Sequence, residues 1–246
     1  MIIFIIVLAF IFEIIDSGLG MMYGTLLTPI LLILGYPVAT VIPCILMSQA
    51  AGGFIGSLFH NKYGNTNLIG ITKDFKIAIL VIISGLIAVT LGVTFASYIP
   101  ETFLKGYIGI LAIAMGILCI VKPIFNFNWW KVVIMGFLAS FNKSSTGGGF
   151  GPLCSTGLIL GGLKSKTSIA LTTLSEVPLC IISFVMYVYL KGFPDLYFLL
   201  ILCLGSALGG TLGPRICAKM DLNILQKIVG ILAIISGCLI TLKLLF

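Results

Sequence analysis

The stretch KSSTGGGFGP, residues 143–152, interrupts surroundings that are otherwise apolar. It holds one lysine, three hydroxyl side chains and four glycines. Three consecutive glycines break a helix, because glycine is conformationally free and disfavoured in helix interiors. The fold therefore has to accommodate polar, non-helical backbone within an apolar chain.

Composition places the chain in the membrane. Of its 246 residues 60% are hydrophobic and 9% are charged, with a mean hydropathy of +1.25, whereas about a quarter of a soluble domain is charged. Several apolar runs reach the roughly 20 residues that a helix needs to cross a bilayer: 77–99, 103–121, 196–213 and 222–246. The sequence predicts an all-α polytopic membrane protein, without a soluble domain.

The start of the chain and its charge fit this class. Residues 1–16 lack the basic region and cleavage site of a signal peptide, so we expect them in the mature protein. The formal net charge of +7 fits lysines that set topology from cytoplasmic loops, so no nucleic-acid partner is predicted.

The chain repeats itself. When it is laid over itself so that Asp16 meets Lys143, DSGLGMMYG (16–24) lies over KSSTGGGFG (143–151), and Gln49 falls on Glu176. Toward the end of each repeat, GILAIAMG (109–116) matches GILAIISG (230–237) at a slightly smaller shift. Such a sustained match predicts two homologous halves, 1–122 and 123–246, within one membrane domain.

The segment 2–34 decides the topology. A glycine-rich break at Gly18–Gly24 leaves arms of about 15 and 11 residues, each too short to span the bilayer alone. The segment is either one broken spanning helix or a re-entrant hairpin that leaves on the side where it entered. Three clear spans follow it in the first half, near 38–59, 77–98 and 103–121.

Basic residues separate these two models. A spanning segment gives parallel halves and divides the basic loop residues seven to six, whereas a hairpin gives inverted halves and divides them ten to three. The positive-inside rule favours the hairpin, with three further transmembrane helices in each half. We therefore expect a multi-pass protein of the cytoplasmic membrane with both termini outside. The ten cytoplasmic residues are Lys62, Lys73, Lys76, Lys122, Lys131, Lys164, Lys166, Arg215, Lys219 and Lys227, and the other three are Lys105, Lys191 and Lys243.

Two inverted hairpins would meet near the midplane of the membrane. Inverted repeats with broken central helices are typical of secondary transporters. The first amides of each return arm lack helical partners and carry the positive end of the helix dipole, which suits an anion. Close helix packing is the alternative explanation for the glycines. The candidate substrate-binding residues are Ser17, Gly18, Gly20, Lys143, Ser144, Ser145, Thr146, Gly147, Gly148 and Gly149.

Ionisable groups inside the membrane are costly and point to function. Glu13, Asp16 and Glu176, with Gln49 at the position equivalent to Glu176, are candidate ion-coupling residues. A carboxyl that keeps its proton is a candidate proton carrier. A structural ion pair of Asp16 or Glu13 with Lys143 is an equally weighted alternative. The coupling ion is H⁺ or Na⁺.

The motifs GGGFGPL (147–153) and, more weakly, GLGMMYGTLLTP (18–29) resemble those of the sulfite exporter TauE/SafE family, also called the toluenesulfonate uptake permease family. The resemblance covers essentially the whole chain, although Met21 and Met22 stand where glycines are expected. It implies transport of a small anion such as sulfite, a sulfonate or sulfoacetate, with no cofactor. The substrate and the direction of transport are not determined by it.

Other classes of protein remain to be weighed. The single histidine, His60, falls in a predicted loop, and neither an HExxH nor a GxSxG motif is present, so neither an enzyme nor a metal site is expected. The alternatives to a transporter are an anion channel and a membrane subunit that transports nothing. A homo-oligomer stays open, because no single face stands out as a dimer surface.

Overall fold

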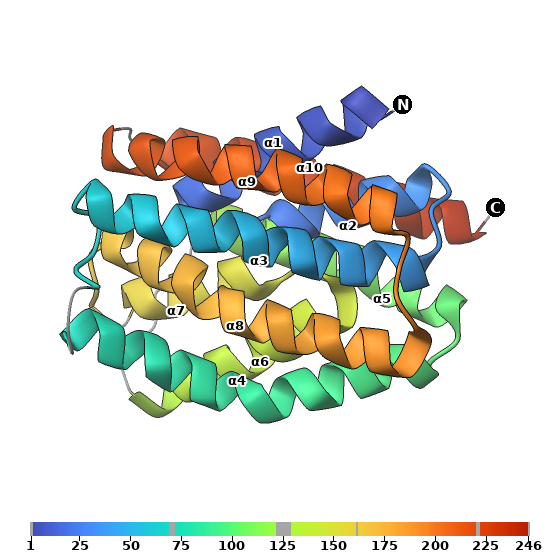
Figure 1. The fold of residues 1–246 in the computed structure, drawn as a ribbon, viewed down its shortest axis with the longest axis horizontal. Helices are drawn as coiled ribbons and strands as arrows, with labels where there is room; N and C mark the ends of the chain where they lie inside the picture. The colour runs from blue at the N-terminus through green and yellow to red at the C-terminus, as the bar shows by residue number, and fades with distance from the viewer. Residues whose placement is uncertain (1, 69–71, 122–128, 161, 220–221, 246) are drawn as a thin grey trace.

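The structure, a computed structural model, describes residues 2–68, 72–121, 129–160, 162–219 and 222–245. Within these ranges it is a bundle of helices (Figure 1). The helices are α1 (Ile2–Leu19), α2 (Tyr23–Ile33), α3 (Val38–Lys62), α4 (Lys73–Tyr98), α5 (Glu101–Val121), α6 (Trp129–Thr146), α7 (Phe150–Leu160), α8 (Ser165–Lys191), α9 (Leu196–Lys219) and α10 (Leu222–Leu245).

Six of the described helices are long and apolar enough to cross a bilayer: α1, α3, α4, α5, α8 and α9. The prediction that the first arm is too short to span was wrong by this criterion, because α1 has 18 residues. In α10, residues Gly230–Leu244 form a shorter apolar helix. The predicted class, an all-α polytopic membrane protein, is therefore confirmed. The predicted boundary between the halves, at residues 122 and 123, lies outside the described residues.

The first hairpin is built from α1 and α2. The helix stops at Leu19 and resumes at Tyr23, within the predicted break. Glycines of α9 allow close contact with α1, since a Cβ at any of them would press on an α1 carbonyl oxygen. In order along both helices the contacts are Gly205 on Ile6, Gly209 on Phe10 and Gly213 on Ile14. Consequently α1 runs parallel to α9, and α2 turns back.

The second hairpin, α6 and α7, is built in the same way against α4. In order along both helices, Gly136 lies against Ser84, Ser140 against Gly85 and Ser144 against Gly92. These contacts make α6 parallel to α4. The chain breaks after Thr146 and resumes at Phe150, so the helix ends where the three consecutive glycines begin.

The two hairpins enter the bundle from opposite ends. Both termini lie at one end, together with the turns at 33–38, 98–101 and 191–196, which we call the terminal end (Figure 1). Lys243 near the C-terminus donates to the carbonyl oxygen of Ile33 there, at 2.8 Å. The opposite end, which we call the far end, holds 60–68, 162–167 and 214–219. The first hairpin starts and finishes at the terminal end, and the second at the far end.

One predicted loop residue belongs to a helix. His60 was expected in the loop after the span 38–59, but α3 continues to Lys62 and His60 is completely buried. Its imidazole nitrogens bond to the carbonyl oxygen of Ser17, at 2.8 Å, and to the side-chain amide of Asn65, at 2.9 Å. These partners allow the polar ring to be buried, which the sequence around it did not indicate.

Candidate functional site

The first tip (residues 16–25) and the second tip (residues 143–152) bend in the same way. Gly20 and Gly147, which occupy equivalent positions in the two repeats, both have positive φ, at 71° and 77°. Met22 and Gly149, the next equivalent pair, have φ of 101° and 81°. Met22 is thus held in a conformation that costs a non-glycine residue about 1–3 kcal/mol. The methionine that replaces an expected glycine keeps the backbone shape of the second tip.

The two tips pack backbone against backbone. A Cβ at Gly24 would overlap the carbonyl oxygen of Gly147, and one at Gly148 would strike the backbone of Gly24 and Thr25. Threonine hydroxyls accept hydrogen bonds from the backbone amides that the break leaves without helical partners. Gly148 N donates to Thr146 Oγ1 at 3.1 Å, and Gly149 N donates to Thr25 Oγ1 at 2.9 Å. The tips are therefore closed on each other.

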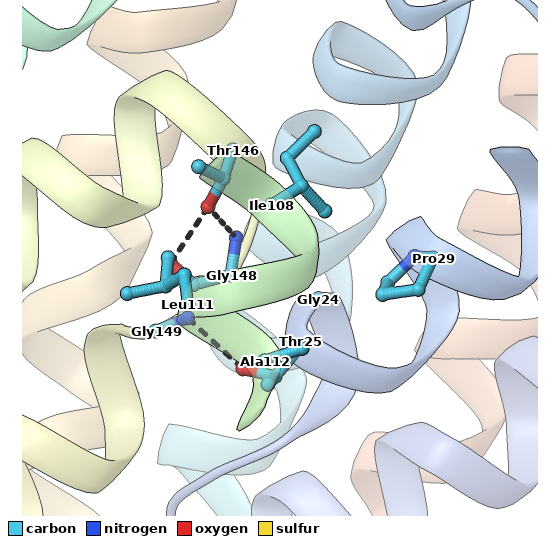
Figure 2. A pocket seen from close by; sticks show the side chains of 9 residues that line it. All are labelled: Gly24, Thr25, Pro29, Ile108, Leu111, Ala112, Thr146, Gly148 and Gly149. Atoms are coloured by element: carbon cyan, nitrogen blue, oxygen red, sulfur yellow. Dashed lines mark hydrogen bonds between the residues drawn. The ribbon is translucent and has the colours of Figure 1, made fainter. Parts of the chain in front are cut away.

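A small cavity remains beside the closed tips. It measures about 10 Å³, which is room for about one water molecule. The tip hydroxyls of Thr25 and Thr146 face it, and Ile108 and Leu111 of α5 close its other side (Figure 2). An anion bound at the tips would need this space to open.

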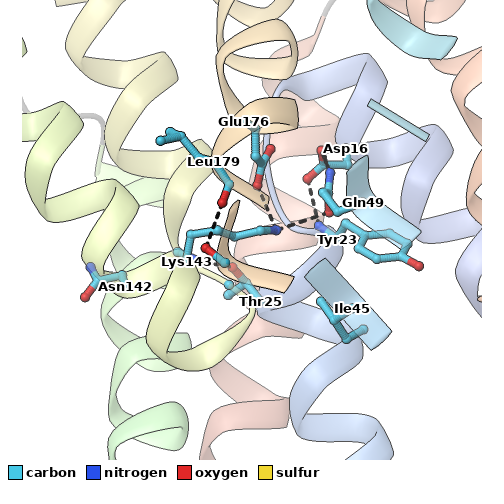
Figure 3. A network of polar contacts seen from close by, with 12 residues as sticks. Asp16, Tyr23, Thr25, Ile45, Gln49, Asn142, Lys143, Glu176 and Leu179 are labelled. Atoms are coloured by element: carbon cyan, nitrogen blue, oxygen red, sulfur yellow. Dashed lines mark hydrogen bonds and ion pairs between the residues drawn. The ribbon is translucent and has the colours of Figure 1, made fainter. Parts of the chain in front are cut away.

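Four polar side chains from four helices meet beside the tips (Figure 3). Lys143 of α6 forms an ion pair with Glu176 of α8, with Nζ 2.7 Å from Oε1. Lys143 Nζ also donates to Gln49 Oε1 of α3 at 3.3 Å, and Gln49 Nε2 donates to Asp16 Oδ2 of α1 at 2.7 Å. All four side chains are buried, none more than 4% exposed.

Asp16 closes the chain of contacts at the first tip. Its other oxygen, Oδ1, accepts a hydrogen bond from the backbone N–H of Tyr23, the first residue of α2, at 2.8 Å. A carboxylate at a helix start is favourable, because the amide dipoles point toward it. The anion position at the start of α2 is thus filled by a side chain of the protein.

The ion pair is not either of those weighed from the sequence. Lys143 was expected to pair with Asp16 or Glu13, but among the described residues its carboxylate partner is Glu176. Gln49 stands between Lys143 and Asp16 and bonds to both. The two tips are therefore joined through an amide.

Glu13 lies in a separate cluster on α1. It is completely buried, and two hydroxyls donate to it, Ser17 Oγ to Oε1 at 2.7 Å and Ser206 Oγ to Oε2 at 2.9 Å. Gly52 of α3 leaves the space for this carboxyl, since a Cβ there would press on Glu13 and Ser206. No ion pair to Glu13 occurs among the described residues.

The hydroxyls predicted to face an anion are turned to their own helix. Ser144 and Ser145 Oγ donate to the carbonyl of Phe141, and Thr146 Oγ1 donates to that of Asn142 at 2.7 Å. Of the predicted glycines, Gly147, Gly148 and Gly149 lie at the contact between the tips. Gly20 lies there too, since a Cβ at Gly151 would strike its carbonyl oxygen, and it also packs on Ile169. Gly18 packs on Gly213.

Two residues that sequence reasoning missed hold the tips from opposite ends. His60 bonds to the carbonyl oxygen of Ser17, and the Tyr187 hydroxyl donates to that of Ser144 at 2.9 Å. His60 and Tyr187 occupy equivalent positions in the two repeats, as do Ser17 and Ser144. The alignment that paired the tips would have paired these two residues as well.

Thr28 of α2 was also missed. Its Oγ1 is buried without a hydrogen-bond partner among the described residues. A Cβ at Gly147 would come within 2.9 Å of this oxygen, so the hydroxyl lies against the second tip. A buried hydroxyl without a partner is uncommon in folded proteins.

Comparison with known proteins gives a consistent result. The family model described as "Sulfite exporter TauE/SafE" matches residues 5–240. The chain is 25% identical over 233 residues to "Probable membrane transporter protein YtnM" of Bacillus subtilis (strain 168), an alignment that covers 89% of this chain and 74% of that protein. No solved structure matches the chain.

Proposed function

The chain belongs to the sulfite exporter TauE/SafE family of membrane transporters, and from that premise we propose that it is a secondary transporter of small anions. The proposed substrates are sulfur-containing oxyanions or organosulfonates, such as sulfite or sulfoacetate. In this proposal the chain is a permease of the cytoplasmic membrane with both termini outside, and it catalyses no reaction.

The observation that carries the proposal is the buried Lys143 at the contact of the two tips. A buried ammonium is costly unless an anion accompanies it, and here Glu176 fills that role. The same tip carries the backbone amides of Gly148 and Gly149, which now bond to threonine hydroxyls. A small oxyanion bound in place of these internal partners would find a full positive charge and several donors together.

Thr28 supports the same position. Its hydroxyl is buried beside Gly147 and has no partner among the described residues. An anion oxygen between the tips would accept its hydrogen bond. We therefore add Thr28 and Thr25 to the proposed substrate-binding residues.

The charges in this region suggest how an ion is coupled. Three carboxyls, Glu13, Asp16 and Glu176, are buried in this part of the bundle together with one lysine, Lys143, so full ionisation would leave two uncompensated negative charges (three minus one). When Glu176 gains a proton, Lys143 loses its counter-charge and is free to hold an anion. Proton and monovalent anion then enter together without a change in buried net charge. We propose H⁺ as the coupling ion. Na⁺ is the alternative, and anion flux that depends on Na⁺ at fixed pH would indicate it.

Glu13 is the second proposed proton site. A completely buried carboxyl without an ion pair is very costly when charged, which favours the neutral acid. Once protonated, Glu13 would donate to one of the two serine hydroxyls that now donate to it. It lies one helical turn from Asp16, so its charge acts directly on the first tip. Its proton would keep the region around the network from accumulating negative charge.

We propose inverted halves for the transport cycle. The two hairpins enter from opposite ends, and each tip is held by a residue of another helix, His60 or Tyr187. Movement of one hairpin against α3, α4, α8 and α9 would open the site to one side at a time, the general pattern of such transporters.

The proposal can be tested by measuring the unfolding temperature of the purified protein with each of a panel of small anions. We expect sulfite or a small sulfonate to raise the unfolding temperature, and Lys143→Ala to abolish that increase. Flux of the same anion into proteoliposomes distinguishes a transporter, which saturates and depends on pH, from a channel. Absence of stabilisation by every sulfur anion, with Lys143→Ala behaving as wild type, would show that the site is wrong.

A further inference from the structure

A second cavity lies at the terminal end. It measures about 230 Å³ and is surrounded by the ends of α3, α4, α5 and α8. By the same measure one water needs about 10–15 Å³, so the cavity has room for a small anion with part of its hydration shell. It is enclosed by Ser97, Glu101, Tyr187 and Lys191, among others.

The inner wall of this cavity touches the second tip. Tyr187 lines the cavity and is only 3% exposed, and its hydroxyl donates to the carbonyl oxygen of Ser144 at 2.9 Å. Ser144 directly follows Lys143. One side chain therefore separates the cavity from the backbone that carries the proposed anion-binding lysine.

The mouth of the cavity carries positive charge. Lys191 follows Tyr187 by one turn of α8, so both side chains lie on the same face of that helix. Glu101 also lines the cavity, but it forms an ion pair with Lys105, with Nζ 2.9 Å from Oε1. The three charges sum to +1 (two lysines minus one glutamate), which attracts an anion.

The wall also holds a polar group without a partner. Ser97 Oγ is buried, at 8% exposure, and forms no hydrogen bond among the described residues. It belongs to the last turn of α4 and lines the cavity. This hydroxyl has no acceptor in the described part of the chain to hold it in place, so the Ser97 side chain is free to turn into the cavity and donate to a ligand there.

We propose that this cavity is the outer vestibule of the transporter, a binding site that takes a small oxyanion or sulfonate before it reaches the tips. Lys191 attracts the anion, and the Ser97 hydroxyl donates a hydrogen bond to it. The hydrogen bond of the Tyr187 hydroxyl to Ser144 is the latch, by which we mean the contact that must break before the anion passes from the vestibule to Lys143. The inference rests on the proposed function. The bond of His60 to Ser17, at the equivalent positions of the first repeat, provides the corresponding latch at the far end.

Thiol labelling in intact cells tests the site. Ser97→Cys should react from outside with the anionic reagent sulfonatoethyl methanethiosulfonate faster than with its cationic trimethylammonium analogue, and methanesulfonate should slow the reaction. Ala39→Cys, at an exposed position of the same cavity, serves if the first variant does not fold. Because the chain has seven cysteines of its own, the unaltered protein gives the background.

Charge variants give an independent measurement. Lys191→Gln should raise the KM for uptake from outside about tenfold, the lower end of electrostatic steering effects, and leave kcat unchanged, while Lys191→Arg should retain the wild-type KM. Lys164→Gln makes the same change at the other end of α8 and should leave the KM for uptake from outside unchanged.

Tyr187→Phe should alter kcat, whereas Tyr189→Phe, at a side chain 88% exposed, should not.

The outcomes separate the two proposals. Equal rates with both reagents and no protection by methanesulfonate, in a protein that still transports, would overturn the vestibule and leave the proposed function standing. If the unaltered protein transported none of the anions tested, the proposed function itself would be refuted. An unchanged KM in Lys191→Gln would likewise overturn the role of that lysine.

Discussion

Glu176→Gln is the substitution that most directly tests the central ion pair. It replaces a carboxylate 2.7 Å from Lys143 Nζ by a neutral amide of the same shape. Removing one partner of a buried pair costs about 3–5 kcal/mol, because a buried charge is left uncompensated. Asp16 remains behind Gln49, so we expect the lower end, about 3 kcal/mol. For a chain of this size that corresponds to a decrease of about 6–12 °C in the unfolding temperature.

The same variant should respond more strongly to an anion. With its carboxylate partner gone, Lys143 is available to a ligand, and an anion at 100 times its Kd would restore about 2.7 kcal/mol. Thermal unfolding in detergent, with and without sulfite or methanesulfonate, measures both effects. Glu101→Gln is the matched control for the loss of stability, because its ion pair with Lys105 is partly exposed and should contribute about 1 kcal/mol or less. The anion response is compared with that of the wild type alone, since Glu101 lines the vestibule. Wild-type stability and an unchanged anion response in Glu176→Gln would refute this reasoning.

Three further predictions concern the tips, the second proton site and the topology. Gly24→Ala should destabilise the protein by about 1–3 kcal/mol in thermal unfolding, because its Cβ would strike the backbone of the facing tip, whereas Gly106→Ala, which meets only a distant side chain, should not. Glu13→Gln should remove an infrared band of a protonated carboxyl that the wild type shows, and an unchanged band would mean that Glu13 holds no proton. Cysteines placed at Asn61 and Ser165 should both label from the cytoplasm, and labelling from opposite sides would eliminate the hairpin model.

Much of the fold follows from local sequence features. The glycines of the first tip predicted a break where α1 stops at Leu19 and α2 starts at Tyr23, because no tertiary contact is needed to disfavour a helix there. Apolar length likewise predicted α3, α4, α5 and α9 as candidate spans, but it underestimated α1. The predicted ends of those helices were less accurate. The helix α3 continues through His60 to Lys62, because Ser17 and Asn65 supply hydrogen-bond partners for the buried imidazole.

The sequence singled out the four polar side chains of the network but not their pairing. The internal repeat brought Asp16, Gln49, Lys143 and Glu176 to notice together. Which carboxylate reaches Lys143 depends on how α6, α8 and α3 cross, and spacing along the chain carries no information about that. Thr28 was missed for a related reason, because an isolated threonine in an apolar helix gives no signal until its hydroxyl is found without a partner.

The central claim is that protonation of Glu176 frees Lys143 to bind an anion, and proton uptake measured together with anion flux tests it most directly. In proteoliposomes loaded with a pH-sensitive dye, an inward gradient of a monovalent sulfonate should carry protons inward with it. Glu176→Gln should remove this proton movement while binding of the anion persists. Anion flux with no accompanying change in internal pH, in the wild type and in the variant alike, would contradict the account.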